Sequence, residues 1–129
     1  MSKQRDRFER ETHTRGRGRV GEEQAVAWLA GQGYAVVERN AVTSAGEIDL
    51  VARDGDTLCF VEIKARSAAD YGLAIAAVGP RKQRRLVRAA TLWLAEHPHP
   101  GPCRFDVLGL DADGDGWAYT LVRDAFPAG

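Results

Sequence analysis

The chain has 129 residues, of which 44% are hydrophobic and 28% charged, which excludes a disordered chain and fits one folded domain. The formal net charge is +0, but bases gather in residues 1–19 and 81–88 and acids near the C-terminus, so we expect an anionic partner at one side. No apolar run approaches the roughly 20 residues of a membrane helix, and residues 1–19 lack the apolar segment of a secretory signal. Two cysteines without a CxxC motif indicate a reduced, cytoplasmic setting. The lack of a long apolar run leads us to expect no membrane partner.

The N-terminal part divides into a tail and the start of a domain. Residues 1–16 have many charges and no apolar period, so we expect a flexible basic tail, followed by one domain over residues 17–126. Apolar spacing predicts a helix over residues 18–31 and a strand over 34–39. Residues 40–45 are polar and are expected to form a loop.

Four more strands and a second helix complete the predicted domain. They are expected over residues 46–53 (strand), 57–65 (strand), 80–96 (helix), 103–110 (strand) and 117–123 (strand). Residues 67–79 lack a period and are expected to be a long connection, after which Pro80 occupies the first turn of the helix. The order α-β-β-β-α-β-β predicts an α/β domain with a mixed central sheet of about five strands flanked by helices.

The hairpin of the second and third strands carries the most informative side chains. Alternate residues share a face of a strand, which places Asp49 on one face and Ile48 and Leu50 on the other. If residues 55–56 are the centre of the turn, Asp49 faces Glu62 and Glu47 faces Lys64; if residues 54–55 are, Asp49 faces Phe60 and Glu62 is its diagonal neighbour. Both registers leave Asp49, Glu62 and Lys64 on one face.

Two carboxylates this close repel each other, and partial burial raises the cost. A proton, a lysine or a divalent cation would offset the repulsion between Asp49 and Glu62, and Mg²⁺ suits oxygen ligands combined with substrate phosphates. Lys64 could stabilise charge on a phosphate, as phosphodiester hydrolysis requires. The alternative is a cross-strand salt bridge between Glu47 and Lys64, with Asp49 and Glu62 on a solvent-exposed surface of the sheet.

Asp49, followed on the next strand by Glu62-Ile63-Lys64, resembles the PD-(D/E)xK nuclease signature. A wider set of motifs resembles the small bacterial YraN-type family, which is similar in fold to archaeal Holliday-junction resolvases. These motifs are Gly18-x-x-Gly21-Glu22, Gly33-Tyr34, Arg39-Asn40, Gly46-Glu47-Ile48-Asp49-Leu50, Phe60-Val61-Glu62-Ile63-Lys64-x-Arg66, Lys82, Arg104-Phe105-Asp106-Val107 and Ala125-Phe126. The resemblance covers about residues 17–126 and implies a restriction-endonuclease-like core.

The resemblance also implies roles for individual residues. Asp49 and Glu62 would ligate Mg²⁺ or Mn²⁺, and Lys64 would be the catalytic lysine. Glu22 matches an extra acidic residue of the resolvase-like branch and would ligate the metal directly or through water. Asp106 could support this site or only start a turn, and the sequence leaves both open.

Basic residues suggest how DNA would be held. Arg81, Lys82 and Arg85 fall in the first turns of the second helix, where bases oppose the helix dipole unless a phosphate binds. Arg66 lies just past the third strand and could reach a phosphate, although all four side chains could also extend into water.

We therefore expect a metal-dependent endonuclease acting on DNA, with branched or damaged DNA as candidate substrates. The alternatives are a non-catalytic nucleic-acid-binding or accessory module on the same fold and a protein-interaction module without a nucleic-acid role. Resolvase-like activity needs paired sites and would favour a homodimer, an expectation that rests on analogy between folds.

Overall fold

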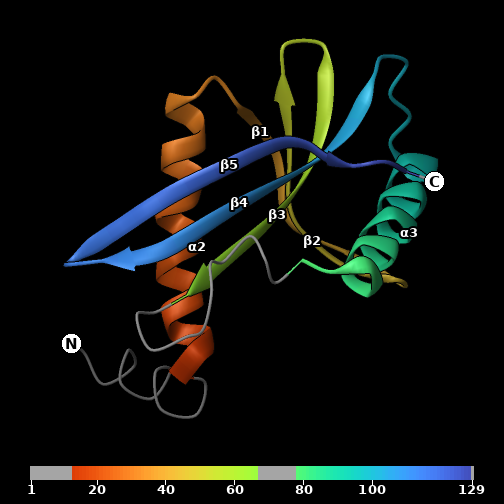
Figure 1. The fold of residues 1–129 in the computed structure, drawn as a ribbon. Helices are drawn as coiled ribbons and strands as arrows, with labels where there is room; N and C mark the ends of the chain where they lie inside the picture. The colour runs from red at the N-terminus through yellow and green to blue at the C-terminus, as the bar shows by residue number, and fades with distance from the viewer. Residues whose placement is uncertain (1–12, 67–77, 129) are drawn as a thin grey trace.

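The computed structural model describes the backbone of residues 13–66 and 78–128, and the side chains of residues 21–66 and 78–128. Its elements are α2 (His13–Gly31), β1 (Ala35–Thr43), β2 (Gly46–Asp54), β3 (Thr57–Arg66), α3 (Pro80–Glu96), β4 (Cys103–Asp113) and β5 (Gly116–Phe126). The strands form one sheet in the order β1-β2-β3-β4-β5, in which β3 and β4 are parallel and the other neighbours antiparallel (Figure 1). The predicted α/β class, element order and mixed sheet are confirmed, consistent with a restriction-endonuclease-like core.

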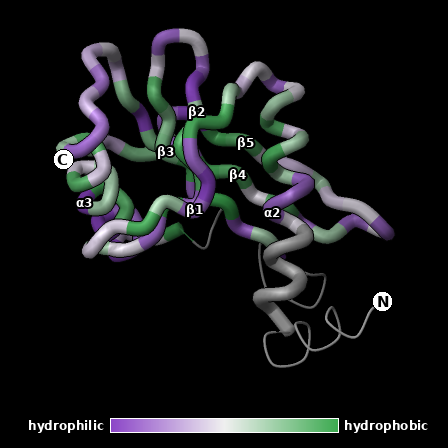
Figure 2. Tube along the Cα trace, turned by 180° about the vertical axis from the view of Figure 1, so that it is seen from behind, coloured by the Kyte–Doolittle hydropathy of each residue, from purple (hydrophilic) through white to green (hydrophobic). Residues whose placement is uncertain are grey.

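The two helices cover opposite faces of this sheet. Leu86 and Trp93 of α3 belong to one buried cluster with Phe60 of β3, and Leu29 of α2 belongs to a second cluster with Val61 of β3. Adjacent residues of β3 thus enter different cores, as alternation in a strand requires. Hydrophobic residues are concentrated in the inner strands, whereas the turn between β2 and β3 is hydrophilic (Figure 2). Neither helix of the described chain is long and apolar enough to cross a membrane.

Several element boundaries differ from the prediction. Helix α2 begins at His13, within the residues assigned to the tail, because extending a formed helix needs no apolar period. The loop predicted over residues 40–45 is wrong, since strand β1 continues to Thr43 and pairs with β2 as far as Gly46. Polar residues are compatible with this strand because it lies at the edge of the sheet. Residues 1–12 of the predicted tail and 67–77 of the predicted connection lie outside the described residues.

The hairpin of β1 and β2 rotates sharply between Leu50 and Ile48. Ile48 lies in the α3-side cluster, whereas Leu50, two residues away, lies in the α2-side cluster. The expectation that the two share a face is therefore wrong. Asn40, opposite the break, has φ 52, a left-handed conformation that asparagine tolerates better than most residues. This rotation carries the end of the hairpin under α3 and away from β3 (Figure 1).

Candidate functional site

Asp49 lies where β2 separates from β3. The ladder between these strands runs from Asp54↔Thr57 to Leu50↔Val61, which confirms the register centred on residues 55–56. It stops one residue short of Asp49, whose Oδ2 instead accepts a hydrogen bond from the backbone N–H of Ile63 at 2.8 Å. The carboxylate thus takes the place of a strand carbonyl and is fixed between the two strands.

The direct cross-strand pairs expected from this register are not formed. The ladder has ended before it could join Asp49 to Glu62 or Glu47 to Lys64, and Glu47 pairs with Val42 of β1 instead. The predicted alternation assumed a regular hairpin, and the rotation at Asp49 breaks that regularity.

Glu62 is nevertheless close enough to Asp49 to disfavour the charged form of the Asp49 carboxyl. Burial raises the pKa of Asp49 from 3.8 to about 7, and the negative charge of Glu62 is the next largest cause. Glu22 on α2 and Glu47 also raise this pKa, whereas the hydrogen bond from Ile63 lowers it. Glu62 is itself only 5% exposed. The structure therefore gathers negative potential around Asp49, with Glu62 as the principal partner.

The lysine beside Glu62 is Lys82 of α3. Its Nζ lies 3.6 Å from Oε2 of Glu62, in an ion pair whose lysine is 34% exposed and whose glutamate is 7% exposed. Lys64 is half-buried and forms no hydrogen bond or ion pair with the residues whose side chains are described. The sequence indicates that Lys82 faces the sheet, because Lys82 lies four residues before the buried Leu86 and so on the same side of α3.

The donor chemistry at Asp49 and Glu62 fits a hard divalent cation. Mg²⁺ is commonly bound through one or two carboxylates, with waters and phosphates completing its shell, and a cation would relieve the repulsion that raises the pKa of Asp49. Within the described residues, no three His, Cys, Asp or Glu side chains converge tightly enough to hold an ion by themselves. Glu22 adds to the negative potential at Asp49 but does not complete a set of three protein ligands.

The predicted DNA-binding residues differ in their exposure to solvent. Arg81 is exposed on the first turn of α3, whereas Arg66 at the end of β3 is half-buried. Arg85 reaches back to the β1–β2 turn, where its Nη1 donates to the carbonyl of Glu47 at 3.4 Å. It lies so close to Gly46 (φ 139) that a Cβ there would be 2.6 Å from Nη1. Arg85 and Lys82 therefore connect α3 to the two strands that carry the acidic residues.

The structure settles the role of Asp106, which the sequence left open. Asp106 is fully buried and accepts hydrogen bonds from the Tyr34 hydroxyl at 2.6 Å, Arg104 Nε at 2.9 Å and the backbone N–H of Asp124 at 2.9 Å. Arg104 also binds Asp54 at the other end of β2 from Asp49. Among the described residues, this network shares no hydrogen bond or ion pair with Asp49 or Glu62.

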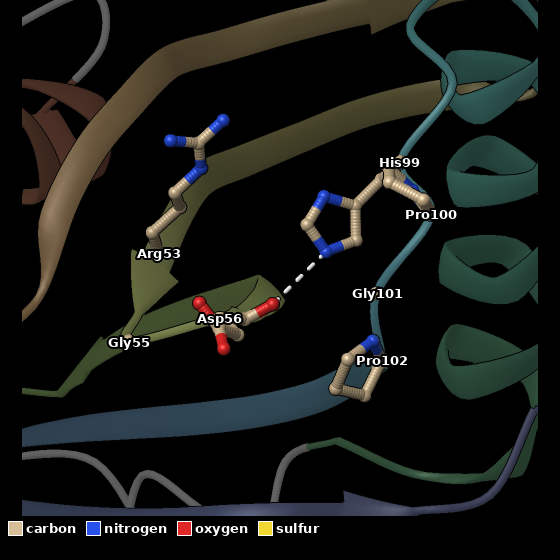
Figure 3. Close-up of a pocket in the computed structure, with 7 residues that line it drawn as sticks. All are labelled: Arg53, Gly55, Asp56, His99, Pro100, Gly101 and Pro102. Carbon is tan, nitrogen blue, oxygen red and sulfur yellow. Dashed lines mark hydrogen bonds between the residues drawn. The ribbon is translucent and has the colours of Figure 1, made fainter.

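A pocket of the described residues also lies away from the acidic site. It has a volume of about 370 Å³ and lies between the β2–β3 turn and the loop that follows α3 (Figure 3). Arg53, Asp56 and His99 line it, and His99 Nε2 lies 3.1 Å from the carbonyl oxygen of Asp56. His99 lies in the loop that follows α3. Among the described residues it does not belong to a cluster of metal-ligating side chains.

Comparisons with known proteins place the chain in a family. Residues 21–110 match the model of a family described as "Uncharacterised protein family UPF0102". A UPF0102 protein of Alcanivorax borkumensis is 47% identical over 112 residues, which cover 84% of this chain and 90% of the relative. A UPF0102 protein of Halorhodospira halophila is 49% identical over 112 residues, covering 87% of this chain and 88% of the relative. The chain therefore belongs to the UPF0102 family, the YraN-type family that its motifs resemble.

Proposed function

We propose that this protein is an Mg²⁺- or Mn²⁺-dependent endonuclease that hydrolyses DNA phosphodiester bonds, with branched or damaged DNA as its substrate class. The observation that carries the proposal is the placement of Asp49 and Glu62 on adjacent strands, where burial and, after it, the negative charge of Glu62 raise the pKa of Asp49 to about 7. Proteins rarely keep a partly buried and a buried carboxylate in repulsion without a functional reason. A phosphodiesterase needs such a site, together with lysines that can meet a phosphate.

The roles of the residues follow from their positions. Asp49, oriented by the N–H of Ile63, and Glu62 would hold the cation, with Glu22 as a further ligand. A bound divalent cation would act as a Lewis acid towards a phosphate oxygen. Lys64 lies on β3, the strand that also carries Glu62. Its ammonium would stabilise the charge that develops on the phosphate.

DNA would be held by basic side chains at and beside the acidic site. Arg66, Arg81, Lys82 and Arg85 lie on β3 and on the first turns of α3, beside the strands that carry the carboxylates. They would contact the phosphates and give an affinity that falls with salt. A homodimer would supply the two sites needed to cut both strands of a branched DNA.

A non-catalytic DNA-binding module is the second candidate function. The ion pair of Lys82 with Glu62 favours it, because an ammonium already balances one of the two carboxylates. A module of this kind would bind DNA in a salt-dependent manner and would need no divalent cation.

The test separates cleavage from binding with one isosteric change. Asp49→Asn should abolish cleavage in Mg²⁺ or Mn²⁺ while DNA binding in EDTA is kept or tightened, because a negative charge near the DNA is removed. Asp113→Asn, at an exposed residue near the end of β4, is the matched control and should cut like the wild type. Full activity of Asp49→Asn would refute the assignment. Binding without cleavage by the wild type would favour the non-catalytic module.

A further inference from the structure

Lysine is scarce in this chain, and its lysines have unusual positions. The chain has three lysines, Lys3, Lys64 and Lys82, among 18 basic residues. Lys64 lies two residues from Glu62 on β3, and Lys82 forms an ion pair with Glu62 from α3. Both lysines with described side chains therefore lie beside one acidic residue, whereas arginines occupy the rest of the basic positions of α3.

The geometry of the ion pair between Lys82 and Glu62 allows the two side chains to separate readily. Glu62 is buried and fixed within the central strand β3, whereas the Lys82 side chain is one third exposed on the first turn of α3. Its separation of 3.6 Å exceeds the 2.7–2.9 Å of a close charge-assisted hydrogen bond. A lysine stem has four rotatable bonds and can move its ammonium into water at small cost.

A divalent cation and this ammonium would compete for the same carboxylate. Two positive charges a few ångströms apart repel each other, and the repulsion is stronger in a partly buried site than in water. The cation would be favoured, since it would interact with both Asp49 and Glu62, whereas Lys82 forms an ion pair with Glu62 alone among the described residues.

We propose that Lys82 is the resident counter-ion of Glu62, which is displaced when a divalent cation binds and then contacts a phosphate of the DNA. This inference rests on the proposed function and adds a regulatory step to it. Before the cation arrives, Lys82 reduces the repulsion between the carboxylates; afterwards, the released ammonium strengthens DNA binding. Cation and DNA binding are thereby coupled, and the coupling must be equal in both directions.

Lysine acetylation measured by mass spectrometry tests the displacement directly. With a lysine-containing peptide as internal standard, Mg²⁺ should raise the acetylation rate of Lys82 about twofold to fivefold, the range expected for losing a partly exposed ion pair. Glu62→Gln should show the raised rate without Mg²⁺, and Mg²⁺ should not increase it further. Asp113→Asn should behave like the wild type. The inference would be overturned if Lys82 were acetylated in Glu62→Gln at the same rate as in the wild type in EDTA.

Calorimetry keeps this inference distinct from the proposed function. At pH 8.5, where protons compete little for the carboxylates, Lys82→Met should bind Mg²⁺ about twofold to fivefold more tightly than the wild type. Arg81→Met, which removes an exposed charge one residue away, should change the affinity less. Equal Mg²⁺ affinities in the wild type and Lys82→Met would overturn the inference and leave the endonuclease proposal intact. No binding of Mg²⁺ or Mn²⁺ to the wild type would overturn both.

The last step of the proposal is tested by DNA binding. Fluorescence anisotropy of a labelled four-way DNA, measured with Ca²⁺ and with EDTA, should show that Ca²⁺ strengthens binding to the wild type. The enhancement should be smaller in Lys82→Met and retained in Arg81→Met. An undiminished enhancement in Lys82→Met would overturn the contact between the released ammonium and DNA.

Discussion

Replacing Asp49 with asparagine should stabilise the cation-free protein, although the proposed function requires the carboxylate. At pH 8.5, above its pKa of about 7, the wild-type side chain is ionised, although partial burial and the negative charge of Glu62 disfavour its charged form. The amide oxygen of asparagine can still accept the hydrogen bond that Ile63 donates at 2.8 Å. The substitution thus removes the repulsion and keeps the contact that positions the strands.

The magnitude follows from the pKa of Asp49. A rise from 3.8 to about 7 corresponds to about 4 kcal/mol of destabilisation well above pH 7. Because water screens part of this charge, we expect Asp49→Asn to raise the free energy of unfolding by about 2 kcal/mol at pH 8.5, and Tm by roughly 5–10 °C. The pKa is higher in the folded than in the unfolded state, so the contribution of Asp49 to wild-type stability falls as pH rises from about 4 to about 7 and is then level.

Urea denaturation in EDTA at pH 5 and pH 8.5 measures this difference. The gain of Asp49→Asn over the wild type at pH 5 should be less than half of the gain at pH 8.5, because the wild-type carboxyl is mostly protonated at pH 5. Asp113→Asn controls for the loss of an exposed charge. A variant that is less stable than the wild type at pH 8.5, or a gain equal at both pH values, would refute the reasoning.

Three further predictions concern other parts of the molecule. Asp106→Asn should lower the free energy of unfolding by about 3 kcal/mol in urea without changing Mg²⁺ affinity, since Asp106 is a buried acceptor of the separate network; a changed affinity would contradict that separation. Gly46→Ala should cost about 1–2 kcal/mol, because φ is 139 and its Cβ would meet Arg85, while Gly31→Ala, with nothing within 4 Å, should not destabilise the protein; equal effects would contradict this explanation. Arg81→Gln should weaken DNA binding and reduce the slope of log K against log salt by about 1; an unchanged slope would exclude a phosphate contact.

The fold could be predicted from the sequence because its local signals agree with its packing. Pro80 begins α3, the turn around Gly55 sets the register of β2 and β3, and apolar periods mark both helices. The polar stretch after Asn40 was the exception. Its strand conformation depends on pairing with β2, a long-range contact that outweighs the local preference of polar residues for a loop.

The candidate site was predictable in its residue types but not in its geometry. Asp49 and Glu62 are brought together as expected, but by a carboxylate that bonds to Ile63 rather than by a direct cross-strand pair. No local pattern indicates the rotation at Asn40 that produces this arrangement. The contact of Lys82 with Glu62 depends on how α3 packs on the sheet, which the spacing of Lys82 and Leu86 only partly indicates.

The most direct measurement of the central claim is a cleavage panel. Linear, single-stranded, flapped and four-way DNA would each be incubated with Mg²⁺, Mn²⁺ or EDTA, using the wild type and Glu62→Gln. The account predicts metal-dependent cutting of at least one branched DNA by the wild type, and loss of that cutting in Glu62→Gln, since a buried carboxylate ligand is removed. Equal cutting by Glu62→Gln would contradict the account, and so would DNA binding without cutting in either metal.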